Sequence, residues 1–273
     1  MGFATGSAPL SALDRHHQRL RPEPAQGKPR LIITADDYGY WPSYNEGILA
    51  AIDSGGIDAV SAMTETPYCD PAPLIELGVE IGLHVDFESR WGARSGASAK
   101  TSLRVQMERF TELFGRWPAF INGHHHCHAR PELATPVFEM ALQIGCPVRA
   151  VGRDHRQWLS ERGIDTADHL IGRMTSDEPA QPAEIKELPP GVTEWFVHPG
   201  YPDPESGSSF DDARKEDLDL VTRLQLRARF DEPVWGQALR SNFSECFERS
   251  GASDQATSRS RRSAWPSSAS GSD

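Results

Sequence analysis

The sequence predicts an α/β fold, specifically a distorted (β/α) barrel of about seven parallel strands that is similar to a TIM barrel. Between residues 31 and 226, short apolar runs typical of strands alternate with stretches typical of helices. This alternation indicates successive βαβ units and a parallel sheet that is buried on both faces. About seven such runs are more than a flavodoxin-like sheet needs. The length of 273 residues also suits one barrel-sized unit.

The predicted strands are rich in apolar and β-branched residues, and the predicted helices carry recognisable start signals. Ser43, with Glu46 three residues later, has the spacing of a capping box and is expected to cap the first helix. The last helix has one broad apolar face that includes Leu218 and Val221. The strands are expected at 31–36, 59–64, 80–87, 119–126, 147–152, 169–172 and 193–200, and the helices at 43–53, 71–77, 102–114, 131–144, 155–161 and 211–226.

The two ends of the chain lack the periodicity of the middle. Residues 1–29 show no strand or helix pattern, so we expect a flexible N-terminal extension before a barrel domain at 30–249. Residues 250–273 are rich in Ser, Ala, Gly and Arg and contain few large apolar side chains. Such a segment cannot offset the entropy cost of ordering, which predicts a disordered tail.

Composition excludes several classes of function. The net charge is −11, from 39 acidic and 28 basic side chains, and no dense Lys/Arg run is present to neutralise phosphates, which argues against nucleic acid as a partner. The four cysteines form no CxxC pair, which indicates a reducing compartment. Neither a signal-like start nor a run of eighteen apolar residues occurs, so we expect a cytoplasmic protein with no membrane partner.

Two adjacent carboxylates, Asp36 and Asp37, follow the first predicted strand, where α/β folds place their active-site loops. Adjacent side chains diverge, so one carboxylate can bind a metal while the other handles a proton. The simpler alternative is a helix N-cap or an Asx turn before Gly39, which is favoured for an isolated Asp-Asp pair.

His84, Asp86 and Glu88 alternate along the third predicted strand and would share one of its faces. Three polar groups on one strand face need a polar environment, which is either a functional site or solvent. An edge strand with one solvated face explains the pattern equally well.

The segment from Gly123 to His128 carries four histidines in five residues, directly after a strand-like run. Such a cluster forms no periodic core face. Neutral imidazole suits Zn, Co, Ni or Mn, and it is compatible with Mg only beside carboxylates. A metal site is therefore favoured over a fortuitous surface cluster, because polar side chains at the carboxyl end of a strand match the usual site geometry.

His198 ends the last predicted strand, just before a Pro-Gly breaker. A lone histidine at such a position is more often structural. It gains weight here because three other strand ends carry the same kind of residue, and a barrel would bring them together at one rim.

The ordered motifs Asp-Asp-Tyr-Gly, Gly-Leu-His, Gly-His-His-His-x-His and His-Pro-Gly resemble those of the YdjC-like carbohydrate deacetylases. The resemblance runs from about Leu31 to about Leu226 and includes the stretches 45–48 and 110–115 between the motifs. Two features depart from the family pattern. One is the N-terminal extension, and the other is the Ser/Arg-rich tail in place of a short final helix and strand.

The resemblance implies a hydrolase that releases acetate from N-acetylated sugars of the N-acetylglucosamine or chitooligosaccharide type. It also implies one divalent metal ion, Mg or Zn, bound by Asp37, His84 and His124. Asp36 would be the general base and His198 the candidate acid. Three further residues are candidate contacts of the substrate or of the other site residues: His128, Asp86 and Arg149. For Arg149, a surface ion pair is an equally good explanation.

Two other functions fit parts of the pattern. One is a different barrel metallohydrolase, such as an amidohydrolase or a phosphoesterase, because a fold does not determine a reaction. Those sites usually hold a His-x-His pair after the first strand or two metals, whereas this first strand ends in Asp36-Asp37. The other is a sugar- or metal-binding protein without catalysis, which would lack the base. A homodimer is expected only from the frequency of dimers among soluble enzymes.

Overall fold

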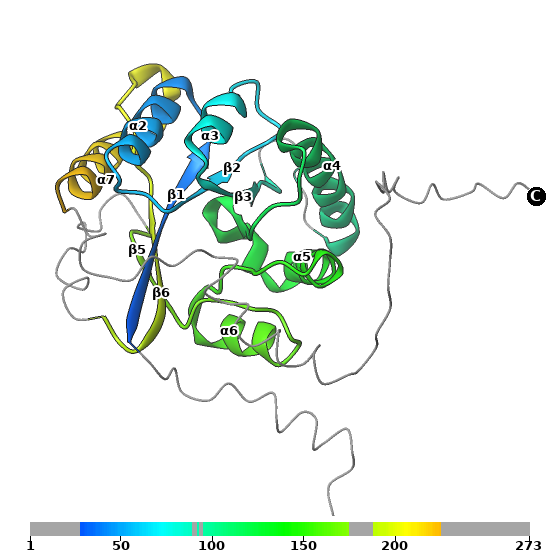
Figure 1. Cartoon of the computed structure of the whole chain (residues 1–273). Helices are drawn as coiled ribbons and strands as arrows, with labels where there is room; N and C mark the ends of the chain where they lie inside the picture. Colours follow the sequence, from blue (N-terminus) through cyan, green and yellow to red (C-terminus); the bar gives the residue numbers. More distant parts are fainter. Residues whose placement is uncertain (1–27, 89–91, 93–94, 175–187, 225–273) are drawn as a thin grey trace, which may run out of the picture. The chain divides into compact units, whose positions relative to one another are not determined.

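A parallel sheet curled into a half-barrel forms the centre of the fold (Figure 1). The computed structural model describes residues 28–88, 92, 95–174 and 188–224. Within them the sheet has six strands in the order β4-β3-β2-β1-β6-β5, and every pairing is parallel. The predicted α/β class with parallel strands is confirmed. The strands are β1 (Pro29–Tyr38), β2 (Ala59–Ala62), β3 (Glu80–Val85), β4 (Ile121–Gly123), β5 (His169–Gly172) and β6 (Gly191–Val197).

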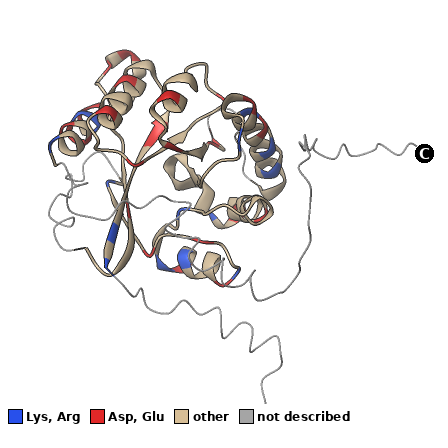
Figure 2. Ribbon diagram, in the orientation of Figure 1, with Lys and Arg blue, Asp and Glu red and all other residues tan. Residues whose placement is uncertain are grey.

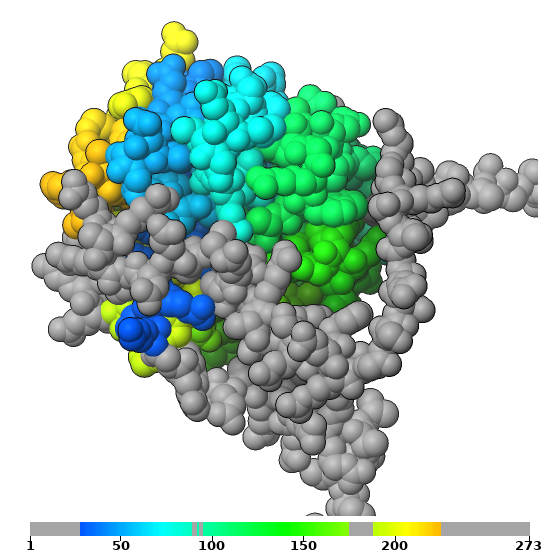
Figure 3. All heavy atoms as spheres, in the orientation of Figure 1, coloured from blue at the N-terminus to red at the C-terminus, as the bar shows by residue number. Residues whose placement is uncertain are grey.

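Helices cover the outer face of this sheet, and α2, α3 and α4 form a continuous layer in the space-filling view (Figure 3). Their inward faces are apolar: Tyr44, Ile48 and Ala51 of α2 are all buried, at the spacing of one helix face. Acidic and basic side chains are mixed on the exposed faces (Figure 2). The helices are α2 (Pro42–Asp53), α3 (Ala72–Leu77), α4 (Gly96–Phe114), α5 (Pro131–Ile144), α6 (Gly152–Ser160) and α7 (Asp211–Leu224), with short 3-10 turns at His124–Ala129 and Pro204–Ser206.

The expectation of about seven strands is corrected to six in the described residues, because 147–152 does not form a strand. This segment makes a single parallel bridge, between Ile121 and Val148. Pro147 has no N–H to donate, and the N–H of Val148 donates to the carbonyl oxygen of Asp165 rather than to a strand. The segment therefore adds one bridge beside β4 but no further strand, and the residues that the structure describes do not close the barrel.

Two helix starts differ from the expectation. The first helix begins at Pro42, so Ser43 lies inside it, and the N-cap residue is Trp41, which makes no side-chain cap. Proline at the first helical position has its φ already set for a helix, which accounts for the earlier start. The helix expected from residue 102 begins at Gly96, where Ser95 and Ser98 form a reciprocal capping box.

The expected disordered tail at 250–273 lies outside the described part, as does the expected flexible extension at 1–29 except for its last two residues, and both stay predictions. Pro29 already belongs to β1. No helix among the described residues has the length and apolar character that crossing a bilayer requires.

On β1, β2, β4 and β6, apolar residues of the inner face near the amino end are followed by buried polar ones. Near the amino ends, Ile32, Ala59, Phe120 and Val192 form a small buried cluster. Two and four residues further along the same strands, side chains of the same face are polar, because strand side chains alternate with period two. These buried polar residues are Thr34 and Asp36 on β1, Ser61 on β2, Asn122 on β4 and Glu194 on β6. The carboxyl ends of the strands thus form a polar rim.

Two glycines allow α2 to approach the loop that follows β6. A Cβ atom at Gly47 would lie 2.5 Å from Cα of Gly200, closer than real Cβ contacts. The Tyr201 N–H donates to the carbonyl oxygen of Ser43 across the same approach, at 3.1 Å. This contact holds the loop that starts at His198 against α2.

We expect Gly47→Ala to destabilise the protein by about 1–3 kcal/mol, because the added methyl group meets backbone rather than a movable side chain. This loss should exceed the gain of up to ~1 kcal/mol in helix propensity. Gly96→Ala is the matched control, since its Cβ would meet only the Glu132 carbonyl oxygen, at 3.7 Å. Urea unfolding measures both variants. Equal stability of the two would show that α2 can move away from Gly200.

Candidate active site

A cavity opens at the polar rim, and residues from several strand ends line it. Asp36 and Asp37 come from β1, His84 from β3, His124 and His126 from the turn after β4, and His198 from the loop after β6. In a parallel sheet the carboxyl ends of all strands lie at the same edge, which explains why residues far apart in sequence meet. All four motifs singled out in the sequence therefore contribute to one cavity.

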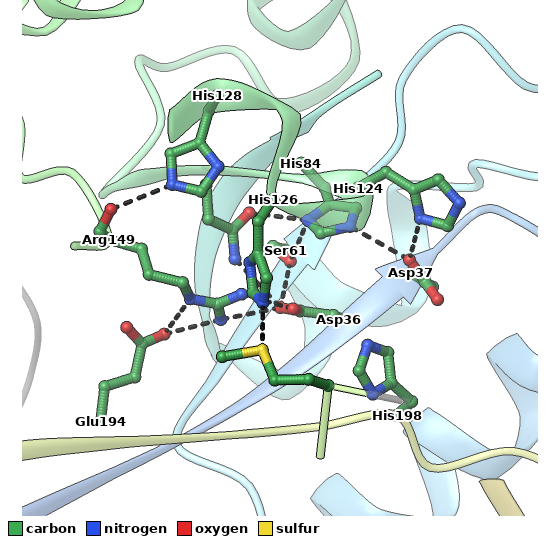
Figure 4. A network of polar contacts seen from close by, with 12 residues as sticks. Asp36, Asp37, Ser61, His84, His124, His126, His128, Arg149, Glu194 and His198 are labelled. Carbon is green, nitrogen blue, oxygen red and sulfur yellow. Dashed lines mark hydrogen bonds and ion pairs between the residues drawn. The ribbon is translucent and has the colours of Figure 1, made fainter. Parts of the chain in front are cut away.

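Asp37, His84 and His124 lie at the centre of this site (Figure 4). Asp37 Oδ1 lies 3.1 Å from His84 Nε2 and 2.9 Å from His124 Nδ1. The three candidate donor atoms all lie within 4.8 Å of one another. Donor atoms around a tetrahedral zinc ion lie roughly 3.3 Å apart, given bonds of about 2.0–2.1 Å. One carboxylate and two imidazoles at this spacing therefore fit a divalent metal ion.

The backbone around these residues adopts left-handed conformations that favour glycine. Asp37 has φ of 71°, and His125 and His126 have φ of 49° and 53°. The rings of His124 and His125 lie close together, with their centroids 4.0 Å apart, whereas the ring of His126 points elsewhere. His124 contacts Asp37, the side chain of His125 is 68% exposed, and His126 turns into the cavity.

Asn122 determines which nitrogen of His84 faces the cavity. The Asn122 amide nitrogen donates to Asp36 Oδ1 at 3.0 Å, so its carbonyl oxygen is the acceptor for His84 Nδ1 at 2.7 Å. Nδ1 of His84 therefore carries the hydrogen, and Nε2 keeps a lone pair that points at the site. Ser61 also donates to Asp36 Oδ1, at 2.7 Å. Asn122 thus orients both His84 and Asp36 through the two ends of one amide group.

Asp36 is buried and paired with Arg149, which is also fully buried. Arg149 makes two hydrogen bonds to the Asp36 carboxylate and two to Glu194 Oε1 (Figure 4). Burial alone would raise the pKa of Asp36, but the guanidinium charge more than offsets this and holds the pKa below its usual range. Burial raises the pKa of Glu194. Arg149 is thus an interior residue that orients Asp36, and a surface ion pair is ruled out.

His198 lies in the cavity with its backbone held by α7. Its N–H donates to Asp217 Oδ2 at 2.9 Å, and its ring Nδ1 is buried without a hydrogen-bond partner in the described residues. Burial lowers the pKa of His198 to about 4, so the ring is neutral at pH 7 in this state. Burial likewise lowers the pKa of His126 to about 3.

Three candidate residues lie outside the cavity lining: Arg149, described above, and His128 and Asp86. His128 is fully buried, and its Nε2 faces the carbonyl oxygen of Arg149 at 3.0 Å, which supports the backbone that carries Arg149. Asp86 follows the end of β3, and its Oδ1 accepts the N–H of Glu88 at 2.8 Å, as in an Asx turn. Glu88 is exposed and pairs with Arg130. Because β3 ends at Val85, Asp86 and Glu88 do not share a strand face with His84 as the sequence predicted.

Several residues of the site were not singled out from the sequence. A usable signal existed for some of them, because a polar residue inside an apolar strand marks a buried polar face. Arg214 gave no such signal, since its helix is amphipathic and its partner Asp37 is 177 residues away. The missed residues are Ser61, Asn122, Glu194 and Arg214, whereas His126 was expected as part of the histidine cluster but without a role of its own.

The family model described as "YdjC-like protein" matches residues 30–232, which include the cavity and all of the described sheet except Pro29. The chain belongs to the YdjC-like family. A carbohydrate deacetylase from Geobacillus stearothermophilus is 30% identical over 233 residues, which are 74% of this chain and 92% of that protein. A chitooligosaccharide deacetylase from Proteus mirabilis strain HI4320 is 27% identical over 242 residues, covering 74% and 94% of the two proteins.

A solved structure shares the fold of this YdjC-like chain. It is a protein from Enterococcus faecalis V583 that was provisionally named a cellobiose-phosphate cleavage protein. The superposition has a TM-score of 0.64 at 20% identity and covers 74% of this chain and 94% of that one. At this identity the likeness establishes the fold alone.

Burial of His126 makes stability depend on pH. The unfolded chain binds a proton near the ordinary histidine pKa of 6.5, whereas the folded state binds it only near 3. The free energy of unfolding contributed by this group therefore falls as the pH drops from 6.5 to 4, by up to ~1.4 kcal/mol per pH unit. His126→Gln should reduce this slope in urea unfolding of the metal-free protein.

His125→Gln is the matched control, because it removes a neighbouring histidine whose side chain is 68% exposed. It should keep the wild-type slope. A His126→Gln protein with an unchanged slope would contradict the burial of His126.

Proposed function

We propose that this YdjC-like chain is a metal-dependent deacetylase of N-acetylated sugars, of the N-acetylglucosamine or chitooligosaccharide type, and that it releases acetate. Its relatives from Geobacillus and Proteus, which carry deacetylase names, support the reaction class. The observation that carries the proposal is the close grouping of Asp37, His84 and His124 beside a separately held carboxylate, Asp36, in one cavity.

Asp37, His84 and His124 would hold the divalent ion. Two imidazoles favour zinc, and magnesium would depend more on the carboxylate. Such an ion, when bound, lowers the pKa of a water molecule and polarises the carbonyl of an acetamide. Asn122 keeps the His84 tautomer in which Nε2 is free to bind.

Asp36 would accept the proton of the attacking water. Its Oδ1 receives hydrogen bonds from Ser61, Asn122 and Arg149, whereas Oδ2 receives one, from Arg149, among the described residues. Oδ2 therefore keeps a lone pair for a further proton. Because Arg149 keeps the pKa of Asp36 low, the carboxylate is ionised at neutral pH and can act as a base but not as an acid.

His198 would donate a proton to the departing sugar amine. At rest the ring is neutral, because burial lowers its pKa to about 4. Negative charge that develops on the carbonyl oxygen during attack raises the pKa of a nearby imidazole. His198 would then receive the proton that Asp36 took from the attacking water and pass it to the nitrogen as the carbon–nitrogen bond breaks, so that acetate and the free sugar amine leave and both side chains return to their starting state.

The alternatives from the sequence predict different products. A phosphoesterase would release phosphate, an amidohydrolase would prefer other amides, and a binding protein would release nothing. Acetate release from N-acetylglucosamine oligomers by the metal-loaded chain is the experiment that separates them. Absence of acetate from every N-acetylated sugar, with metal bound, would contradict the proposal.

The two adjacent aspartates should respond differently to the same substitution. Asp36→Asn should retain metal and lose turnover by roughly 10²-fold or more, the usual scale for a general base. Asp37→Asn, His84→Ala and His124→Ala should each lose most of the metal, because two remaining ligands hold a labile ion poorly. Elemental analysis and acetate release measure both effects. Full metal content in the two histidine variants would contradict the ligand set.

His198→Ala should lower kcat while metal content and KM change little, because the ring would act only on the leaving amine. The loss should shrink for an activated aryl acetate, whose leaving group needs no protonation. Loss of metal in this variant would make His198 a ligand. Equal losses of kcat on the amide and on the ester would show that His198 positions the substrate and does not act as an acid.

A further inference from the structure

Arg214, on α7, contacts the oxygen of Asp37 that does not face the two imidazoles. Asp37 Oδ1 is the atom next to His84 and His124. Asp37 Oδ2 instead accepts a hydrogen bond from Arg214 NH2 at 2.7 Å. The side chains of Arg214 and Asp37 are only 3% and 2% exposed, so solvent screens this ion pair little. The two oxygens of one carboxylate thus have different partners.

The Arg214 guanidinium is itself held in place. Its central carbon lies 4.0 Å from the centroid of the Tyr44 ring. The Tyr44 hydroxyl in turn donates its hydrogen to Asp211 in the first turn of α7, and Ser206 Oγ lies 2.6 Å from the same hydroxyl oxygen. The ring centroids of Tyr40 and Phe210 each lie 5.9 Å from the same guanidinium carbon. Arg214 therefore cannot turn away from Asp37 without leaving an aromatic pocket.

We propose that Arg214 is a positioning residue that restricts Asp37 to one metal-facing oxygen. This inference rests on the metal site proposed above. A carboxylate binds a metal through one oxygen or through both, and a guanidinium on Oδ2 removes the second option. One oxygen and two imidazole nitrogens then supply three donors, which leaves coordination positions free for water and for the substrate carbonyl.

Two other roles for Arg214 predict different results. A purely structural ion pair would affect the free energy of unfolding but not the metal geometry. Direct contact with the sugar, which the position of Arg214 in the cavity lining allows, would change KM. Neither role predicts a change in the ligand sphere of the metal in the absence of substrate.

The test uses the full chain loaded with cobalt(II), whose visible absorption weakens as its coordination number rises. In Arg214→Gln the absorption should weaken without substrate, because the second Asp37 oxygen joins the metal. On an N-acetylglucosamine oligomer kcat should fall by about 10-fold or more, with KM within about threefold. Arg214→Lys keeps the positive charge, so it should recover part of the cobalt absorption and part of kcat. Arg223→Gln, an exposed change on the same helix, should match the wild type.

An unchanged cobalt spectrum in a folded Arg214→Gln protein would overturn the proposal, and a rise in KM alone would assign Arg214 to substrate binding instead. If the glutamine variant does not fold, the lysine variant decides: intermediate absorption supports the proposal and wild-type absorption overturns it. A wild-type chain that binds no cobalt would contradict the proposed metal site itself, which is a separate result.

Discussion

The burial of ionised side chains inside the half-barrel is the constraint on which the rest of the site depends. Arg149, Asp36 and Glu194 are each 1% exposed or less. Removing such charges from water costs several kcal/mol per ion, and it is tolerated only where opposite charges and hydrogen bonds replace the lost solvent. Because β1, β6 and the segment between α5 and α6 each supply one member, this charge cluster ties three separate parts of the chain together.

The same constraint divides the work between two adjacent aspartates. Asp36 pairs with Arg149 on the inner side of the sheet, and Asp37 pairs with Arg214 of α7. Neighbouring residues of an extended chain point apart, and the left-handed φ of Asp37 adds to this divergence. Each carboxylate therefore has its own guanidinium, so that in the proposed reaction one can bind the ion while the other stays available for a proton.

The site is also connected through neutral groups. Asn122 contacts both His84 and Asp36, so a movement of His84, the proposed ligand, would also displace Asp36, the proposed base. On the other side, α7 supplies Arg214 to Asp37 and Asp217 to the backbone of His198. Helix α7 thus holds two parts of the cavity that belong to different strand ends. Its contacts with α2 place it beside β1, where the aspartates lie.

The sequence by itself determined the parallel α/β class and which residues meet, because the carboxyl ends of parallel strands share one edge. Asp36, His84, His124 and His198 could be placed at one rim on that ground alone. Only the tertiary structure decided that the segment 147–152 adds a single bridge to β4, that His126 enters the cavity while His125 stays exposed, and that Arg214 reaches Asp37. Local patterns report the period of a strand or helix, whereas these features depend on positive φ angles and on pairings between distant segments, which leave no periodic trace.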